Sequence, residues 1–327
     1  MSAPAPVPVT VLTGFLGAGK TTLLSALLRR PEMAGTAVFI NEVGAIAIDH
    51  HLVRDVKGDA VILGSGCVCC TVAGDLVRAL LELAAQVARG EVPPYQRALV
   101  ETTGLADPTG VLAAIVNHPL IARHYQPGAV VTAVDGQLGR DTLVRQRESV
   151  AQVALADRIV ITKTDLAAAD DLDALEAAIR EKNAGAAIVR SAHGAIEPDV
   201  LLAPAPDTDW IDAATRRPVG HGFISTFTVC FGKPVRMGPL GLWLTLITQM
   251  HAGSLLRVKG LVDIEGETAP FVIDCVQHVI HPARQLAAWP DDDRRTRIVF
   301  IARGLAAGTI KSLRVSLADS LGQPLVD

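Results

Sequence analysis

Gly14-Phe15-Leu16-Gly17-Ala18-Gly19-Lys20-Thr21-Thr22 is the stretch of sequence that decides the fold. It satisfies the pattern GxxxxGK[ST], follows an apolar run at Val7–Leu12 and precedes a helix-like stretch at Thr21–Arg30. A strand before the pattern and a helix after it are the context in which this pattern binds phosphate groups. We therefore expect a phosphate-binding loop whose contact residues are Gly14, Gly17, Ala18, Gly19, Lys20, Thr21 and Thr22.

The residue types of this loop suit a nucleoside triphosphate and its metal ion. Glycines let backbone N–H groups approach phosphate oxygens closely, and the following helix adds its positive N-terminal end. We expect Lys20 to reach the β- and γ-phosphates as a point charge. The hydroxyl of Thr21 is expected to be one of the few protein ligands of Mg²⁺.

Apolar runs rich in Val and Ile recur between helix-like stretches in the N-terminal part of the chain. Runs without polar alternation are typical of strands that are covered on both faces of a sheet. The runs are Val7–Leu12, Ala37–Ile40, Ala60–Leu63, Arg97–Val100, Ala129–Val134, Arg158–Ile161 and Ala187–Val189, and the helix-like stretches are Thr21–Arg30, Thr71–Arg89, Asp107–His124, Asp141–Ala156 and Asp171–Asn183. The alternation predicts an α/β fold with a mostly parallel sheet.

The pattern changes after a segment rich in proline and glycine among polar residues, between 203 and 222. Beyond it the extended runs are Phe223–Phe231, Leu255–Glu265, Phe271–His278 and Arg297–Ala302, and the helical stretches are Leu240–His251 and Leu305–Leu317. We predict a phosphate-loop domain at 1–203, a linker at 204–220 and a second, smaller α+β domain at 221–327.

Composition and charge narrow the class of protein. The 327 residues are 50% hydrophobic and 20% charged, with 30 basic against 34 acidic residues and a net charge of −4, so a nucleic-acid partner is not expected. Proline, glycine and polar residues interrupt the uncharged stretches, so we expect no signal peptide or membrane span. Five cysteines, three of them clustered, indicate a reducing compartment, and we expect the cytoplasm.

Thr162-Lys163-Thr164-Asp165 follows the predicted strand Arg158–Ile161. The carboxyl ends of the strands of an open α/β sheet are where such sheets bind their ligand. A carboxylate there accepts two hydrogen bonds from the N1–H and N2–H₂ groups of guanine, whereas adenine offers no such pair of donors. Asp165 therefore favours GTP over ATP, and we expect Thr162 and Lys163 to bind the nucleotide beside it.

Cys67, Cys69 and Cys70 lie between a predicted strand and a predicted helix, with Gly64 and Gly66 nearby. In a strand the three side chains would not share a face, so only a loop lets all three sulfurs converge. Three thiolates satisfy most of a tetrahedral Zn²⁺ site or that of a similarly soft ion, and leave a fourth place for an exchangeable ligand. Cys67 and Cys70 are also spaced as a CxxC redox pair, which is the alternative interpretation.

Glu101 follows the predicted strand Arg97–Val100, where phosphate-loop enzymes place an acid that meets Mg²⁺ or the attacking water. Gly104 lacks a side chain, so its backbone N–H can approach the γ-phosphate closely and report whether that phosphate is present.

The chain carries these motifs in the order in which they occur in the CobW-like GTPase metallochaperones, and it resembles that family. These proteins are relatives of the nickel-inserting GTPases of urease and hydrogenase maturation. The resemblance covers nearly the whole chain. It rests on the phosphate loop, Asn41–Gly44 with Asp49, Cys67–Cys70, Glu101–Gly104 with Ala106–Pro108, Thr162–Asp165, and in the second domain on Leu256–Gly260, Trp289-Pro290 and Arg297–Arg303. Two departures are Ala45, where members often have a second acidic residue, and the lack of a His-rich run.

The resemblance implies an Mg²⁺-dependent GTPase of low turnover, with Lys20, Glu101 and Asp49 in its catalytic machinery. It implies that Zn²⁺ or Co²⁺ bound at the cysteines is delivered to a client metalloprotein, which the second domain recognises. Glu42 and His118 are candidates for additional metal contact. The alternatives are a small-molecule kinase or ATPase, and a nucleotide-gated thiol redox sensor.

Overall fold

The computed structural model describes residues 5–40, 61–64, 72–204 and 224–326. The chain divides into two compact units, Met1–Ile179 with Ala186–Ala205 and Arg180–Gly185 with Pro206–Asp327. The predicted linker at 204–220 falls almost entirely on residues that the structure does not describe, so the domain boundaries stay a prediction.

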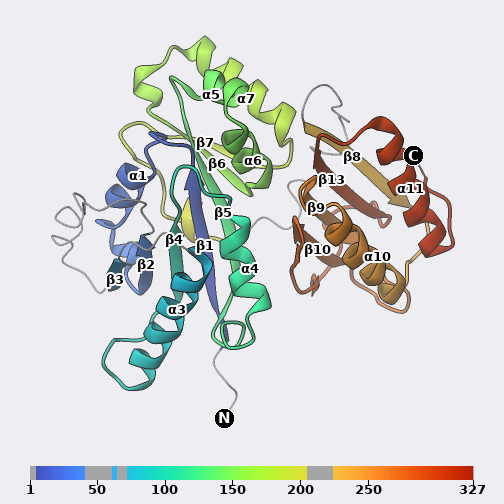
Figure 1. Ribbon diagram of the computed structural model, residues 1–327, viewed down its shortest axis with the longest axis horizontal. Coiled ribbons are helices and arrows are strands. Elements are labelled where there is room, and N and C mark those ends of the chain that lie inside the picture. The colour runs from blue at the N-terminus through green and yellow to red at the C-terminus, as the bar shows by residue number, and fades with distance from the viewer. Residues whose placement is uncertain (1–4, 41–60, 65–71, 205–223, 327) are drawn as a thin grey trace. The chain divides into compact units, whose positions relative to one another are not determined.

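A seven-stranded parallel sheet forms the centre of the first unit (Figure 1). Its order is β3-β2-β4-β1-β5-β6-β7, and β1 therefore lies between β4 and β5. The strands are β1 (Val7–Gly14), β2 (Thr36–Ile40), β3 (Val61–Gly64), β4 (Arg97–Glu101), β5 (Tyr125–Asp135), β6 (Arg158–Thr162) and β7 (Ala187–Arg190). Each corresponds to an apolar run in the sequence, which confirms the predicted α/β fold.

Helices cover both faces of this sheet. They are α1 (Lys20–Leu27), α3 (Val72–Ala88), α4 (Thr109–Asn117), α5 (Gly139–Arg145), α6 (Arg147–Leu155), α7 (Ala169–Lys182) and α8 (Asp199–Leu202). Leu12, Val38 and Val131 on one face pack against α1 and against Leu201 of α8. Thr132 points to the opposite face, where its hydroxyl donates to the Gln152 carbonyl of α6 at 2.9 Å.

Two predicted helices of the first unit are wrong in extent. The stretch Asp107–His124 is helical only as far as Asn117, because the residue before Pro119 is disfavoured in the α conformation and His118 is extended. The stretch Asp141–Ala156 is two helices, α5 and α6, separated at the extended residue Gln146. This break lets α6 turn inward, so that every residue from Ser149 to Leu155 is buried.

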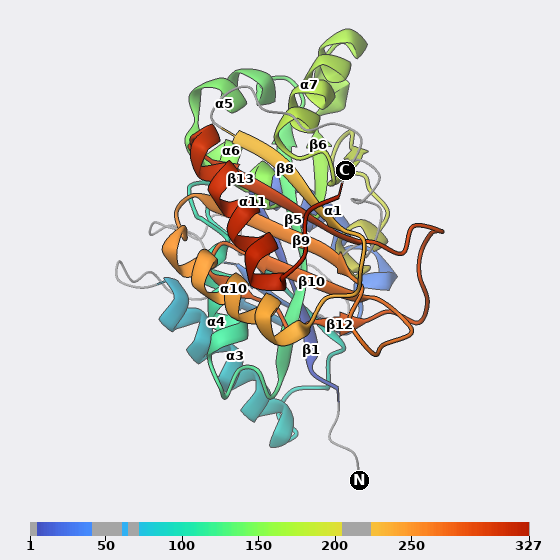
Figure 2. The same ribbon diagram turned by 90° about the vertical axis from the view of Figure 1, so that its right-hand side faces the viewer.

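The second unit is an antiparallel sheet with two helices on one face. The order is β11-β10-β9-β13-β8, and β12 pairs with β10. The elements are β8 (Ile224–Phe231), α10 (Met237–Met250), β9 (Leu255–Val262), β10 (Phe271–Val276), β11 (Val279–Ile280), β12 (Arg284–Gln285), β13 (Thr296–Arg303) and α11 (Ala307–Leu321). Figure 2 shows α10 and α11 side by side over the sheet, which is the predicted α+β arrangement.

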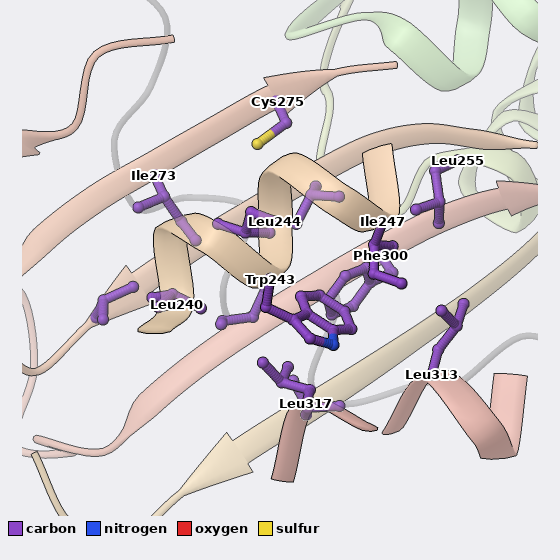
Figure 3. Packing of buried hydrophobic residues seen from close by; sticks show 14 of the residues in the cluster. Leu240, Trp243, Leu244, Ile247, Leu255, Ile273, Cys275, Phe300, Leu313 and Leu317 are labelled. Carbon is purple, nitrogen blue, oxygen red and sulfur yellow. The ribbon is translucent and has the colours of Figure 1, made fainter. Parts of the chain in front are cut away.

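Trp243 on α10 is central to the core between these helices and the sheet (Figure 3). Its ring meets Phe300 edge to face, with 6.1 Å between the ring centroids. Its indole Nε1–H donates to the Ser316 hydroxyl on α11 at 3.0 Å. This hydrogen bond gives a partner to the one polar atom of the ring, which burial would otherwise leave unpaired.

The family-like motifs of the second domain have structural roles. Arg257 on β9 is buried and donates to both carboxylate oxygens of Asp274, at 3.1 and 2.7 Å. Arg297 on β13 is buried likewise and donates to both oxygens of Asp291, at 2.8 and 2.9 Å. A Cβ at Gly260 would lie 2.7 Å from a side-chain carbon of Ile273 on the neighbouring strand β10, so a larger residue there would have to displace that side chain.

Candidate phosphate and guanine site

The phosphate loop lies between the carboxyl end of β1 and the start of α1. Gly14, Gly17 and Gly19 have φ angles of 143°, 76° and 81°, which L side chains rarely adopt. At Gly14 a Cβ would also collide with the Ala133 carbonyl oxygen on β5. The sequence therefore needs glycine at these points to wrap the backbone into a loop. Ala18 is buried inside this loop and Thr22 is exposed on α1.

Lys20 is the first residue of α1 and is buried. Its Nζ donates to the carbonyl oxygens of Gly14 at 2.8 Å and Phe15 at 3.3 Å, so the ammonium group lies across the mouth of the loop. This is the charge that the sequence predicts beside the β- and γ-phosphates.

Thr21 and Glu101 meet although 80 residues separate them in sequence. The Thr21 hydroxyl donates to Glu101 Oε1 at 2.8 Å. They meet because β1 and β4 are parallel neighbours, with Leu12 in register with Glu101, so both carboxyl ends reach one edge of the sheet. A hydroxyl and a carboxylate side by side are the hard oxygen donors that Mg²⁺ prefers, so the pair fits the predicted ion.

The segment after β4 lies directly against the phosphate loop. Thr102 donates its backbone N–H to the Leu12 carbonyl at 2.9 Å, and its hydroxyl to Thr13 Oγ1 at 2.9 Å. A Cβ added to Gly104 would lie 2.7 Å from the Leu16 backbone nitrogen. The absence of a side chain at Gly104 is therefore what allows this close approach.

Thr162 and Lys163 connect β6 to the same loop. The Thr162 hydroxyl donates to the Ala18 carbonyl at 2.8 Å, and Lys163 Nζ donates to the Gly17 carbonyl at 2.8 Å. Lys163 itself has a φ of 53°, in the left-handed region. The predicted base-binding residues and the predicted phosphate-binding residues thus form one continuous site.

Asp135, at the end of β5, also belongs to this site, although no motif in the sequence marks it. Its Oδ2 pairs with Lys163 Nζ at 2.6 Å, and its Oδ1 accepts the backbone N–H groups of Gln137 at 2.8 Å and Leu138 at 3.0 Å. Burial raises the pKa of this carboxyl, but the hydrogen bonds from Lys163, Leu138 and Gln137 outweigh burial and hold the pKa below its ordinary value. Asp135 therefore stays ionised and fixes the lysine.

Ser191-Ala192-His193 is a second group that sequence reasoning missed. It follows β7, and the Ser191 carbonyl accepts the Thr164 N–H at 3.2 Å. His193 donates its backbone N–H to Asp165 Oδ1 at 3.3 Å, and its Nδ1 lies 3.5 Å from Asp165 Oδ2. The segment thus forms a wall beside the predicted guanine acceptor. The only signal in the sequence is its place directly after the last predicted strand.

Cys67, Cys69, Cys70, Glu42 and Asp49 lie outside the described residues. Among the residues that the structure does describe, no group of three or more His, Cys, Asp or Glu side chains is arranged to hold a metal ion. Cys230 and Cys275 lie in β8 and β10 of the second unit, where Cys275 is buried and Cys230 is half-buried.

His118 is placed away from the phosphate loop by the helix that precedes it. The nine residues of α4 span roughly 13 Å at the usual rise of an α-helix, and His118 follows their last residue. Its Nδ1 accepts the Ile121 backbone N–H at 3.4 Å. The structure does not bring His118 together with the residues of the phosphate site.

Comparison with known proteins supports the same assignment over the whole chain. Residues 8–190 match the CobW/HypB/UreG nucleotide-binding domain, and residues 224–317 match the C-terminal domain of the cobalamin synthesis protein CobW. The zinc chaperone YjiA of Escherichia coli is 30% identical over 313 residues, which cover 94% of this chain and 97% of that protein. The zinc chaperone CobW of Pseudomonas aeruginosa is 30% identical over 364 residues, with 97% and 93% covered.

A solved structure gives the same result for the fold. The crystal structure of the Zn(II)-bound YjiA GTPase from E. coli matches with a TM-score of 0.73 at 26% identity, covering 96% of this chain and 99% of that one. In the part of the chain that is described, no helix is both long and apolar enough to cross a membrane. The resemblance seen in the sequence motifs is confirmed, and the chain belongs to the CobW/HypB/UreG family.

Proposed function

We propose that this protein is a GTP-hydrolysing metallochaperone that carries Zn²⁺, or a similarly thiophilic divalent ion, and delivers it to a client metalloprotein. The observation that carries the nucleotide part is the meeting of Thr21 with Glu101 at 2.8 Å beside a phosphate loop. The metal part is supported by the relatives that are named zinc chaperones and zinc-regulated GTPases.

Each residue of the phosphate site has a defined task in hydrolysis. The glycine-rich backbone and Lys20 hold the β- and γ-phosphates, and Thr21 with Glu101 would hold Mg²⁺, which neutralises charge on the phosphate oxygens when bound. Gly104 brings its backbone N–H towards the γ-phosphate. Asp49 is proposed as a further residue of the Mg²⁺ shell or of a nucleotide-sensitive loop.

Asp165 selects the base. Its carboxylate accepts from the N1–H and N2–H₂ groups of guanine, while Lys163 is held between Gly17 and Asp135. Ser191 and His193 hold the segment after β7 beside Asp165 through their hydrogen bonds with Thr164 and Asp165.

The cargo site is proposed at Cys67, Cys69 and Cys70. Three thiolates suit Zn²⁺ and Co²⁺, and a fourth, exchangeable ligand makes release possible. Glu42 and His118 remain candidates for additional metal contact. Clustered thiols stay reduced in the cytoplasm, which we propose as the compartment, and we assign client recognition to the second domain.

Nucleotide preference tests the GTPase part. We expect wild-type protein to hydrolyse GTP and to bind it far more tightly than ATP. Lys20→Ala should lose hydrolysis, because the charge at the β- and γ-phosphates is lost at a cost of at least about 3 kcal/mol. Asp165→Asn should weaken GTP and strengthen xanthosine triphosphate binding, since xanthine replaces one guanine donor with a carbonyl. Equal affinities for ATP and GTP would instead favour the kinase or ATPase alternative.

Metal analysis tests the chaperone part. Replacing Cys67, Cys69 and Cys70 together by Ser should abolish tight Zn²⁺ binding under reducing conditions, with GTP binding retained because the phosphate loop and Asp165 lie elsewhere. Cys230→Ser in the second unit is the matched control and should bind Zn²⁺ as wild type does. Unchanged Zn²⁺ affinity in the triple variant would refute the cargo site, and reversible thiol oxidation without metal dependence would favour the redox sensor.

A further inference from the structure

Gln152 is a buried polar side chain, and the residues next to it on its helix are nearly all apolar. It is 1% exposed and lies on α6, where all residues from Ser149 to Leu155 are buried. Burying an amide is unfavourable unless its polar atoms find partners. A methionine would fill the same space with no such requirement, so the presence of glutamine calls for a physical reason.

The partners of Gln152 are in the segment that follows β4. Its Nε2 donates to the carbonyl oxygens of Gly104 at 3.3 Å and Ala106 at 3.1 Å. Both N–H groups of one amide thus hold two carbonyls that stand two residues apart. The other end of the side chain, Oε1, is buried and has no hydrogen-bond partner among the described residues.

Among the described residues, the side-chain hydrogen bonds of Gln152 involve the NH₂ group of its amide and not the carbonyl oxygen. The two donors are satisfied, while the acceptor is left unpaired at a cost to stability. A group retained for packing alone would not be expected to leave a buried oxygen in this state. The donors, and therefore the position of the Gly104–Ala106 backbone, account for the residue.

The same backbone segment lies against the phosphate loop. A Cβ at Gly104 would be 2.7 Å from the Leu16 nitrogen, so a small displacement of this segment changes its distance to the phosphate loop directly. Thr102 fixes the start of the segment through Leu12 and Thr13. Gln152 fixes its continuation from the opposite side, and the segment is held at both ends.

We propose that Gln152 is a positioning residue for GTP, which holds the Gly104 backbone where its N–H can meet the γ-phosphate. This inference rests on the proposed function. A segment already held in place loses less conformational freedom when the γ-phosphate binds, so affinity for GTP rises. GDP lacks that phosphate and gains nothing, and Gln152 therefore sets the preference for GTP over GDP.

The test compares Gln152→Met with a matched control in full-length protein. Met keeps the length and volume of Gln but donates no hydrogen bond. We expect affinity for a non-hydrolysable GTP analogue to fall about tenfold, equivalent to about 1.4 kcal/mol, with GDP affinity within about twofold of wild type. Hydrolysis should show a lower kcat, because Gly104 is less well placed during reaction as well.

The control is Thr132→Val. The Thr132 hydroxyl donates to the backbone carbonyl of Gln152, so this variant removes a buried hydrogen bond to the same residue without touching the Gly104 segment. We expect it to lose stability but to keep the wild-type ratio of GTP-analogue to GDP affinity. An unchanged ratio in Gln152→Met, or an equal change in both variants, would overturn the inference.

Two further measurements keep the outcomes separate. If Gln152→Met does not fold, Gln152→Asn replaces it: the amide stays polar, but it is one methylene shorter and can no longer hold both the Gly104 and the Ala106 carbonyls. The ratio of GTP-analogue to GDP affinity should fall in this variant as well, and an unchanged ratio would count against the inference. Failure of wild-type protein to bind GTP would overturn the proposed function itself, which Lys20→Ala tests independently.

Discussion

Gly104 shows how much can depend on one missing side chain. In Gly104→Ala the new Cβ would lie 2.7 Å from the Leu16 nitrogen and 2.8 Å from its Cα, both backbone atoms of the phosphate loop. Because that backbone cannot shift cheaply, the segment must move away from the loop. We expect GTP hydrolysis to fall by about tenfold or more, since a misplacement of about 1 Å at an active site is costly. Steady-state phosphate release measures this effect.

Gly110→Ala is the matched control. It lies on α4 in the same part of the chain, and a Cβ there meets nothing within 4 Å. Alanine in a helix is favoured over glycine by roughly 0.5–1 kcal/mol, so this variant should be slightly more stable than wild type and fully active. Full activity in Gly104→Ala would show that close approach to Leu16 is not needed for hydrolysis.

Asp135 links the stability of the site to pH. Its pKa lies below the ordinary value near 4, so the ionised form is favoured by folding. The resulting stabilisation is complete above about pH 4 and is lost as the pH falls through the lower, folded-state pKa. In Asp135→Asn we expect the free energy of unfolding to drop by about 1–2 kcal/mol near neutral pH, with the partly exposed Lys163 limiting the effect.

Urea unfolding of both proteins across the acid range checks this prediction. The difference between wild type and Asp135→Asn should shrink as the pH falls to the most acidic value at which both still fold. Two stability curves that stay parallel at all pH values would contradict a role for the ionised carboxylate.

The residues that sequence reasoning found and those it missed differ in kind. Lys20, Thr21 and Asp165 lie in short patterns whose spacing already carries their chemistry. Asp135 and Gln152 are single polar residues, and their importance comes from contacts made by strand order and helix placement. Glu101 is intermediate, because its position after a predicted strand indicates an acid near Mg²⁺, whereas its contact with Thr21 depends on β4 lying beside β1.

Strands were predicted more reliably than helix ends, for physical reasons. Strands β1, β2, β4, β5 and β6 are buried over most of their length, so their apolar runs are nearly continuous in the sequence. The end of α4 and the break between α5 and α6 are decided by a proline and by the need to bury seven consecutive residues. The end of α4 can be predicted from Pro119 in the sequence, whereas the break between α5 and α6 depends on tertiary packing of α6 against β1 and β5.

Helix α10 offers a test of packing within the second unit. Trp243 is buried against Phe300 and bonded to Ser316, whereas Leu242, the preceding residue, is 64% exposed. We expect Trp243→Ala to lower the free energy of unfolding by about 3–5 kcal/mol, through lost burial and the cavity that remains. Leu242→Ala should change it by less than about 0.5 kcal/mol.

Circular dichroism in urea is the suitable measurement, because it does not depend on tryptophan fluorescence. Wild type, Trp243→Ala and Leu242→Ala should be compared at one protein concentration. Similar losses in the two variants would mean that the side chain of Leu242 is covered in solution, in contrast to its exposure in this structure.

At the scale of the whole molecule, the nucleotide-binding residues and the metal-binding cysteines have to act together for the proposed function. The nucleotide residues are joined by direct contacts through the phosphate loop, whereas the three cysteines are known only by sequence. Glu42, Asp49 and the cysteines lie between the phosphate loop and Glu101 along the chain. That order is the basis for proposing that one nucleotide-dependent rearrangement reaches both sites.

Thermodynamic linkage turns this proposal into a measurable prediction. If GTP changes the affinity for Zn²⁺ relative to GDP, Zn²⁺ must change the preference for GTP over GDP by the same factor. We expect a factor of about 5–150, which corresponds to about 1–3 kcal/mol of coupling. Zn²⁺ should be titrated into protein loaded with GDP or with a non-hydrolysable GTP analogue, and both nucleotides into protein with and without Zn²⁺. In the triple cysteine variant the nucleotide preference should no longer respond to Zn²⁺. Identical Zn²⁺ affinities in the two nucleotide states would leave hydrolysis without any free energy to drive delivery from this site.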